Sequence, residues 1–241
     1  MFQFLTALWQ GHGEGEAPVK TAIFDLDGTL ADTSQDLLAA ANACFDRPWL
    51  TMEADRATAY LGGRAMLRVA FTRQGRTWTE AEVDAAYPEL IKHYETALAV
   101  HTTLFPGVVD ALDRLAAAGW RLGVCTLKPA FLAEALLETL GVRDRFHALT
   151  GADSLPYKKP DPRHLLDTIR AAGGTPETAV LIGDSQTDRD TAAAARVASV
   201  LVTFRPAGLD VAAMAPTGLL DDYASLEPVL EGVLAAPRAA G

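Results

Sequence analysis

Short apolar segments alternate with amphipathic segments along most of this chain, and this alternation constrains its fold more than any other feature. Each of the five apolar segments is short and ends in polar residues, as buried strands do: 19–27, 121–126, 146–152, 178–184 and 198–204. Helical patterns lie between them, at residues 106–119, 129–141, 161–174 and 188–197. Strands that alternate with helices pair in parallel, so the sequence predicts an α/β fold built on a doubly wound parallel sheet.

Residues 34–100 interrupt this alternation. They carry helical patterns and no convincing strand, and the main patterns are at 34–45, 62–71 and 79–98. An insertion after the first strand would lie over the carboxyl edge of the sheet, where ligands bind in such folds. We therefore predict a small all-helical cap at 34–100 that acts as a lid, with hinges near 31–34 and 101–104. Residues 19–33 and 101–241 then form the α/β core.

The N-terminal 18 residues have a different character from the rest. The apolar stretch at 1–10 has no basic flank and no small-residue cleavage site, and it is followed by a glycine-rich, partly acidic stretch. We predict an N-terminal tail at 1–18, not a signal peptide, with a short self-association helix as the alternative.

Charge and cysteine content limit the partners and the compartment. The net charge of -10 disfavours nucleic acid and anionic membrane surfaces as partners, and no apolar stretch is long enough to cross a bilayer. The two cysteines, Cys44 and Cys125, match no metal-binding spacing, and we expect both to be buried free thiols. A reducing cytoplasm fits this pattern best.

Polar side chains follow several predicted strands at the ends that share one edge of the sheet. Because carboxyl ends of parallel strands meet there, these side chains should converge. Clustered carboxylates repel one another unless a divalent cation or shared protons compensate, and oxygen ligands suit Mg²⁺. The converging residues are Asp25 and Asp27 after the first strand, Thr126 and Lys128 after the second, Asp184, Ser185 and Asp188 after a later one, and Lys158 and Lys159 from the loop before it.

Four segments, in order, resemble the motifs of the haloacid dehalogenase (HAD) superfamily of phosphotransferases: "DLDGT" from Asp25, the strand-ending Thr126, "KKPDP" from Lys158, and "GDSQTD" from Gly183. The likeness covers nearly the whole chain after the tail and implies a HAD-like Rossmannoid core with a helical C1-type cap. Within the superfamily the chain most resembles phosphoglycolate phosphatases. It departs from them at Leu127, where asparagine is usual, and in "TFRPAG" at 203–208, where tyrosine-glycine is usual.

The resemblance also implies roles for the polar residues. Asp25 would be the nucleophile that forms an aspartyl-phosphate, and Asp27 the general acid and then the general base. Mg²⁺ would be held by the side chains of Asp25 and Asp184 and by the backbone carbonyl of Asp27. Thr126 and Lys159 would bind the phosphoryl group and stabilise its charge.

Further residues are expected to support the site or bind substrate. Asp188 and Ser185 would lie in the outer shell of the metal site, where Asp188 would position Lys159. An equal alternative for Asp188 is that it simply caps the N-terminus of the following helix. Lys128, Arg64 and Gly63 are substrate-binding candidates. For Arg64 a surface position at a helix start is at least as good an explanation. Lys159 is preferred to Lys158 because it directly precedes Pro160.

These features predict a Mg²⁺-dependent phosphatase for a small phosphorylated metabolite, with 2-phosphoglycolate as the leading substrate, in a monomer or homodimer. Other small phosphate esters or sugar phosphates are alternative substrates, and a β-phosphoglucomutase-like phosphomutase is an alternative enzyme. A phosphoryl-accepting receiver domain is disfavoured, because its acceptor aspartate follows a later strand and it lacks a cap. Dehalogenation is also disfavoured, because it would leave Asp27 and Asp184 without a purpose.

Overall fold

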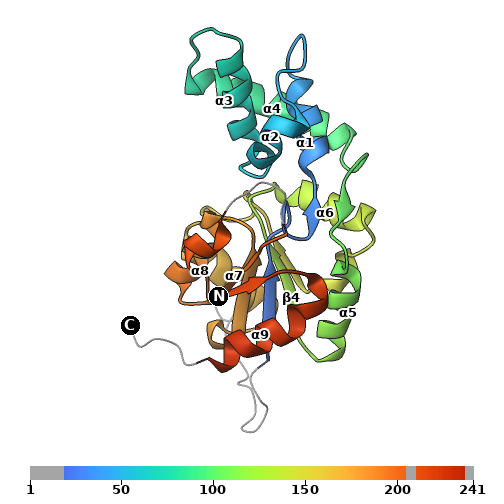
Figure 1. Ribbon diagram of the computed structural model, residues 1–241, viewed down its shortest axis with the longest axis vertical. Helices are drawn as coiled ribbons and strands as arrows, with labels where there is room; N and C mark the ends of the chain where they lie inside the picture. The colour runs from blue at the N-terminus through green and yellow to red at the C-terminus, as the bar shows by residue number, and fades with distance from the viewer. Residues whose placement is uncertain (1–18, 205–209, 237–241) are drawn as a thin grey trace, which may run out of the picture.

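The chain folds into a parallel sheet with helices on both faces and a separate group of helices above one edge (Figure 1). This computed structural model describes residues 19–204 and 210–236, so the predicted tail at 1–18 and most of the departure at 203–208 lie outside the described residues. None of the helices in those two ranges is both long and apolar enough to cross a membrane.

Six parallel strands form the main sheet, in the order β5-β4-β1-β6-β7-β8. The chain adds β4 and β5 on one side of β1 and then returns to add β6, β7 and β8 on the other side. β1 is thus the point where the strand order reverses, and ligands bind outside the carboxyl ends of the strands at such a point. The strands are β1 (Thr21–Phe24), β4 (Arg121–Cys125), β5 (Ala148–Thr150), β6 (Ala179–Gly183), β7 (Ala198–Val202) and β8 (Gly218–Leu220).

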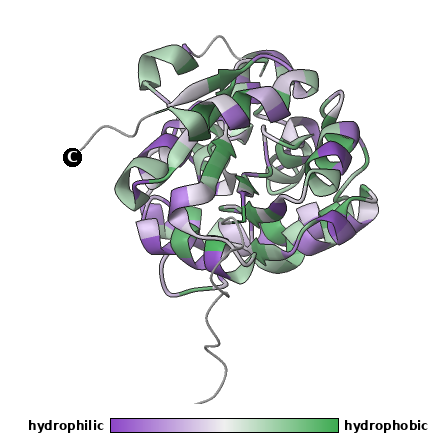
Figure 2. Ribbon diagram, turned by 90° about the horizontal axis from the view of Figure 1, so that it is seen from below, coloured by the Kyte–Doolittle hydropathy of each residue, from purple (hydrophilic) through white to green (hydrophobic). Residues whose placement is uncertain are grey.

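Helices cover the two faces of this sheet with two separate apolar clusters. On one face the clustered residues come from α5 (Val108–Ala117), α6 (Ala130–Thr139) and α9 (Leu226–Ala235). On the other face they come from α7 (Pro162–Ala171) and α8 (Gln186–Ala195). Figure 2 shows the hydrophobic strands at the centre, with helices of mixed hydropathy around them. Burial of both faces explains why the strands appear in the sequence as uninterrupted apolar runs.

The cap has an apolar cluster of its own. Its helices are α1 (Ser34–Asn42), α2 (Met52–Ala59), α3 (Gly63–Arg73) and α4 (Glu80–Thr96). Their buried residues pack mainly against one another, and Leu132 of α6 joins them from the core. α4 begins with a capping box, in which the Thr79 hydroxyl accepts from the Glu82 amide and the Glu82 carboxylate accepts from the Thr79 amide.

Two short strands connect the cap to the core. β2 (Ala31–Asp32) and β3 (Thr103–Leu104) pair antiparallel, so the chain enters and leaves the cap side by side. Beyond them the Asp36 carboxylate accepts hydrogen bonds from the backbone amides of His101 and Thr102, at 2.9 and 2.8 Å. The predicted hinge segments coincide with this double connection, and hinge motion itself stays a prediction.

Several elements were not expected from the sequence. These are the connecting strands β2 and β3, the edge strand β8, the helices α2 and α9, and the 3-10 turns Arg143–Arg145, Pro176–Thr178, Val211–Met214 and Tyr223–Ser225. Two expectations also need correction. α8 begins at Gln186, two residues before the predicted start, because Ser185 caps it. Cys125 is buried as expected, but Cys44 is only half-buried, because it lies just beyond the end of α1.

Candidate active site

A cavity lies between the carboxyl ends of the central strands and the cap. Its volume, counted as the space that the centre of a water molecule can occupy, is about 140 Å³. Its floor is formed by residues that follow β1, β4 and β6, and its roof by α2, α4 and the loop that leads into α3. Of the predicted site residues it is lined by Asp25, Asp27, Gly63, Thr126, Lys128, Lys159, Asp184 and Ser185. The predicted convergence at this edge of the sheet is therefore observed.

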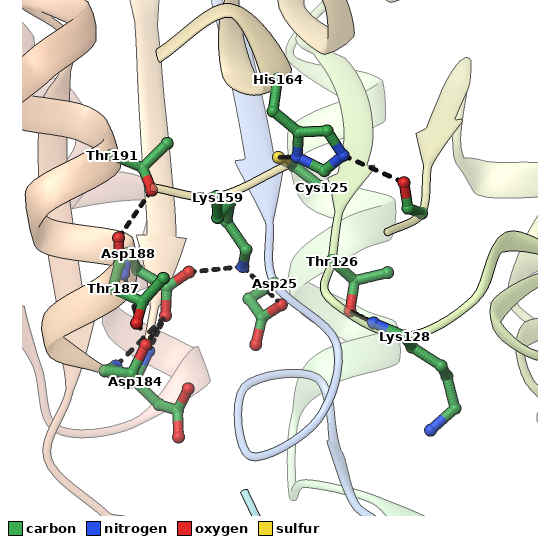
Figure 3. A network of polar contacts seen from close by, with 12 residues as sticks. Asp25, Cys125, Thr126, Lys128, Lys159, His164, Asp184, Thr187, Asp188 and Thr191 are labelled. Carbon is green, nitrogen blue, oxygen red and sulfur yellow. Dashed lines mark hydrogen bonds and ion pairs between the residues drawn. The ribbon is translucent and has the colours of Figure 1, made fainter. Parts of the chain in front are cut away.

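Asp25 lies at the floor of the cavity and is paired with Lys159. The Lys159 ammonium donates to Asp25 Oδ1 at 2.8 Å and to Asp188 Oδ1 at 2.6 Å (Figure 3). Burial raises the pKa of Asp25 to about 6, while Lys159 opposes this shift. Burial alone would lower the pKa of Lys159, but Asp188 and Asp25 raise it above its ordinary value, so the lysine remains charged. The neighbouring Lys158 is not among the residues that line the cavity, which supports the choice of Lys159.

Asp184 completes a compact group of carboxylates. One oxygen each from Asp25, Asp184 and Asp188 lies within 4.8 Å of the others, and all three residues are buried. Gly28 allows this approach, because a Cβ at that position would lie 2.5 Å from Asp184 Oδ2. Its φ of +85° also lies in the left-handed region that favours glycine. The carboxylates of Asp25 and Asp184 offer the oxygen ligands that suit Mg²⁺, while Asp188 is engaged by Lys159 and Ser185.

Asp188 supports this group through both its contacts and its place on α8. It occupies the third position of the helix, and Ser185 is the N-cap; the alternative in which Asp188 itself caps the helix is therefore wrong. Asp188 Oδ2 accepts from the Ser185 hydroxyl at 2.5 Å and from the Ser185 and Asp184 amides at 3.2 and 3.3 Å, while Oδ1 accepts from Lys159. Asp188 thus fixes Lys159 relative to the end of β6.

Asp27 is held apart from the carboxylate group. β1 ends at Phe24, and the chain then turns, so Asp25 and Asp27 do not share one face of a strand. Asp27 Oδ1 accepts from the Thr33 hydroxyl at 2.6 Å and from the Lys128 ammonium at 2.8 Å. This arrangement keeps the Asp27 carboxylate beside Lys128 and leaves the carboxylates of Asp25, Asp184 and Asp188 as a group.

Thr126 follows β4, and only 1% of its surface is exposed. Its amide donates to the Thr150 carbonyl at 3.0 Å, and its hydroxyl accepts from the Lys128 amide at 3.1 Å. Behind it, His164 Nε2 donates to the Gly151 carbonyl at 3.0 Å, which leaves Nδ1 to accept from the Cys125 thiol at 3.2 Å (Figure 3). Burial lowers the pKa of His164, so the imidazole is neutral and supports this loop without adding charge.

The two cap candidates differ. Gly63 lines the cavity, but Arg64 does not. The Arg64 side chain donates to Asp84 at 2.9 Å and lies over the Tyr87 ring, 3.9 Å from its centroid. This placement matches the surface alternative for Arg64, and its role in substrate binding is not supported.

The sequence did not single out the three tyrosines in the roof, Tyr60, Tyr87 and Tyr94. Tyr60, at the end of α2, lines the cavity and donates to Asp32 of β2 at 2.7 Å, and Tyr94 of α4 lies beside Lys128. Nothing in the local sequence distinguishes these residues from core aromatics, because only the packing of the cap against the core places them here.

Replacing Gly28 with alanine is expected to displace the Asp184 carboxylate. The new Cβ would require Asp184 Oδ2 to move, and the positive φ adds strain of about 1 kcal/mol. We expect at least a tenfold weaker binding of Mg²⁺ in a calorimetric titration, on the order of the effect of a displaced ligand partner. Gly173→Ala is the matched control, because Gly173 has φ +87° and open space around its Cβ position. Equal behaviour of the two variants would contradict the crowding at Asp184.

Comparison with known proteins places this geometry in a family. Residues 22–202 match the family described as "Haloacid dehalogenase-like hydrolase". The chain belongs to this hydrolase family. It is 38% identical over 212 residues to the phosphoglycolate phosphatase of Agrobacterium fabrum, and the alignment covers 87% of this chain and 91% of that protein. It is also 38% identical over 207 residues to the phosphoglycolate phosphatase of Mesorhizobium japonicum, and that alignment covers 85% of this chain and 91% of that protein.

The haloacid dehalogenase-like fold is also found in solved structures that superpose on this one. A crystal structure of a predicted phosphoglycolate phosphatase from Haemophilus somnus has a TM-score of 0.78 and 26% identity, and covers 89% of this chain and 99% of that chain. The superfamily and the fold class predicted from the sequence are thus confirmed.

Proposed function

We propose that this haloacid dehalogenase-like hydrolase is a Mg²⁺-dependent phosphatase that cleaves a small phosphate monoester, with 2-phosphoglycolate as its substrate. The observation that carries the proposal is the Asp25 carboxylate on the floor of the cavity, which is paired with Lys159 at 2.8 Å and grouped with the buried carboxylates of Asp184 and Asp188. A buried carboxylate beside a fixed cation is a suitable nucleophile for phosphorus.

In the first half of the proposed reaction, an oxygen of Asp25 attacks phosphorus and the bond to the ester oxygen breaks. This step forms an aspartyl-phosphate. Asp27 gives a proton to the departing alkoxide oxygen, so that oxygen leaves as a neutral hydroxyl group. The Lys159 ammonium and the Thr126 hydroxyl stabilise the phosphoryl oxygens, and both side chains line the cavity next to Asp25.

In the second half, water attacks the phosphorus of the aspartyl-phosphate. Asp27 takes a proton from that water, the bond between phosphorus and Asp25 breaks, and inorganic phosphate leaves. Asp27 is suited to both steps because Thr33 and Lys128 hold its Oδ1 in place, while its Oδ2 accepts no hydrogen bond from the described residues. The same carboxylate then returns to the protonation state in which it began.

The residues present fit the expected cation. Asp25 and Asp184, with the Asp27 carbonyl, would hold Mg²⁺, and Asp188 would orient Lys159 beside it. When bound, the cation would neutralise charge on Asp25 and on the phosphoryl group. Gly28 keeps the space next to Asp184 free of side-chain atoms.

The relatives' names and the nature of the cavity support a small substrate. Two relatives that are 38% identical are named phosphoglycolate phosphatase. The described lining contains no Asn, Gln, His, Arg or Glu side chain, and most of its roof is leucine, isoleucine and tyrosine. Such walls offer few partners for the many hydroxyl groups of a sugar.

Initial rates over a panel of phosphate esters test the proposal. We expect Mg²⁺-dependent release of inorganic phosphate, fastest from 2-phosphoglycolate, with activity lost in EDTA and restored by excess Mg²⁺. The panel includes glycerol 3-phosphate and glucose 6-phosphate, and a second assay follows β-glucose 1-phosphate with a bisphosphate activator. Preferential turnover of a sugar phosphate, or isomerisation without phosphate release, would overturn the proposed substrate or reaction.

A further inference from the structure

Two lysines line the cavity, and one of them, Lys159, lies at the end where the phosphoryl group is proposed to bind. Lys159 donates to both Asp25 and Asp188. Lys128 is the other cation among the described lining residues, and Figure 3 shows it projecting away from Lys159, from the loop after Thr126. Lys128 is therefore the cation available to pair with a second negative charge on the substrate.

The Lys128 side chain is held in a position that suits such a contact. Only 6% of its surface is exposed, and its ammonium donates to Asp27 Oδ1 at 2.8 Å. It also lies over the ring of Tyr94, 4.4 Å from the centroid. An ammonium has three hydrogens to donate, so the contact with Asp27 leaves donors for a ligand.

Tyr94 supplies an independent observation. Its side chain lines the cavity, only 1% of its surface is exposed, and its hydroxyl lies beside the Lys128 ammonium. An ammonium can only donate, so the hydroxyl proton has no acceptor among the described residues. Buried hydroxyl groups almost always use their hydrogen-bonding capacity, so an unused proton at a cavity wall marks a place where a ligand or a water accepts. The nearby cation makes an anionic acceptor the better match.

We propose that Tyr94 and Lys128 form a carboxylate-binding subsite that receives the anionic end of the leaving group. This inference rests on the proposed function, because it takes the phosphoryl group to lie at Asp25. One carboxylate oxygen accepts from the Tyr94 hydroxyl and the other from the Lys128 ammonium. Since Lys128 also contacts Asp27, the subsite adjoins the acid that protonates the ester oxygen, and it suits a short hydroxy acid such as glycolate.

The subsite makes a prediction about selectivity. The substrates to compare are 2-phosphoglycolate and 2-hydroxyethyl phosphate, which replaces the carboxylate with a neutral hydroxymethyl group. In Tyr94→Phe, the ratio of their kcat/KM values is expected to fall about tenfold, the usual effect of one hydrogen bond to a charged group. Lys128→Gln is expected to lower the same ratio further. Tyr87→Phe, on the same helix, is the matched control and should keep the wild-type ratio. An unchanged ratio in Tyr94→Phe would overturn the subsite.

A binding measurement separates this inference from the proposed substrate. Titration calorimetry with Mg²⁺ compares phosphonoacetate with ethylphosphonate, which lacks the carboxylate. The subsite predicts tighter binding of phosphonoacetate by the wild-type protein and loss of most of that preference in Tyr94→Phe. If 2-phosphoglycolate is not hydrolysed but the Tyr94-dependent preference is present, the proposed substrate fails and the subsite stands. If 2-phosphoglycolate is hydrolysed but the two phosphonates bind equally, the subsite fails and the proposed function stands.

Discussion

Replacing Asp25 with asparagine is expected to reduce kcat for every phosphate ester by more than roughly 10⁴-fold, because the amide cannot form the acyl-phosphate bond of the proposed reaction. The fold should be kept, since the amide has the same shape and can still accept from Lys159. Circular dichroism and thermal unfolding check the fold, and phosphate release checks the rate. Turnover within a hundredfold of the wild-type rate would refute the covalent route.

The same variant has a second signature, in the dependence of stability on pH. Burial raises the pKa of Asp25 from its ordinary 3.8 to about 6, so the folded state binds this proton more tightly than the unfolded chain does. The contribution of Asp25 to the free energy of unfolding therefore falls as the pH rises from about 4 to about 6. Asparagine removes this contribution. In EDTA, Asp25→Asn should lose less stability than the wild-type protein across that range, and a parallel loss in both would show that Asp25 is not desolvated.

Replacing Lys159 with methionine is expected to lower kcat by about 10²- to 10³-fold, because the phosphoryl oxygens lose a fixed positive charge. Lys158→Met is the matched control in the same loop. Lys158 does not line the cavity, so its removal should change kcat less than threefold, a change below about 1 kcal/mol in barrier. Similar losses in both variants would show that neither lysine has a specific place at the phosphoryl group.

Lys159→Met also leaves Asp25 and Asp188 buried without their cation, which typically costs about 3 to 5 kcal/mol of stability. The double variant Lys159→Met/Asp188→Asn separates folding from chemistry. It removes one charge of each sign, so it should recover stability without recovering kcat. Recovery of both would mean that Lys159 acts only by holding the fold together.

The core of the fold was largely predictable, because its signals are local. Strands buried on both faces appear as apolar runs, and Gly119 and Gly141, both with positive φ, end helices as the sequence indicated. β8 was missed because three residues carry too little pattern. α9 contains Pro228 and Gly232, which mask its helical character although it packs well against the sheet.

The residues of the candidate site also fall into those that local sequence signals predict and those that they do not. The positions of Asp25, Lys159 and Asp184 follow from strand ends in a parallel sheet, and they are brought together as expected. The placement of Arg64 away from the cavity and of Tyr94 within it depends on how α4 packs in the cap. Such contacts join residues distant in sequence, and no local pattern in one chain specifies them.

The antiparallel pairing of β2 with β3 brings the two ends of the 34–100 insertion together at Asp32 and Thr103. A segment joined to its host in this way can be lengthened, shortened or exchanged without changing the span that the host must bridge. Asp25 and Lys159 belong to the host, whereas most of the cavity roof belongs to the insertion. The roof can therefore be changed while the residues around Asp25 stay in place, and exchanging residues 34–100 for another helical segment is a way to alter the shape of the cavity.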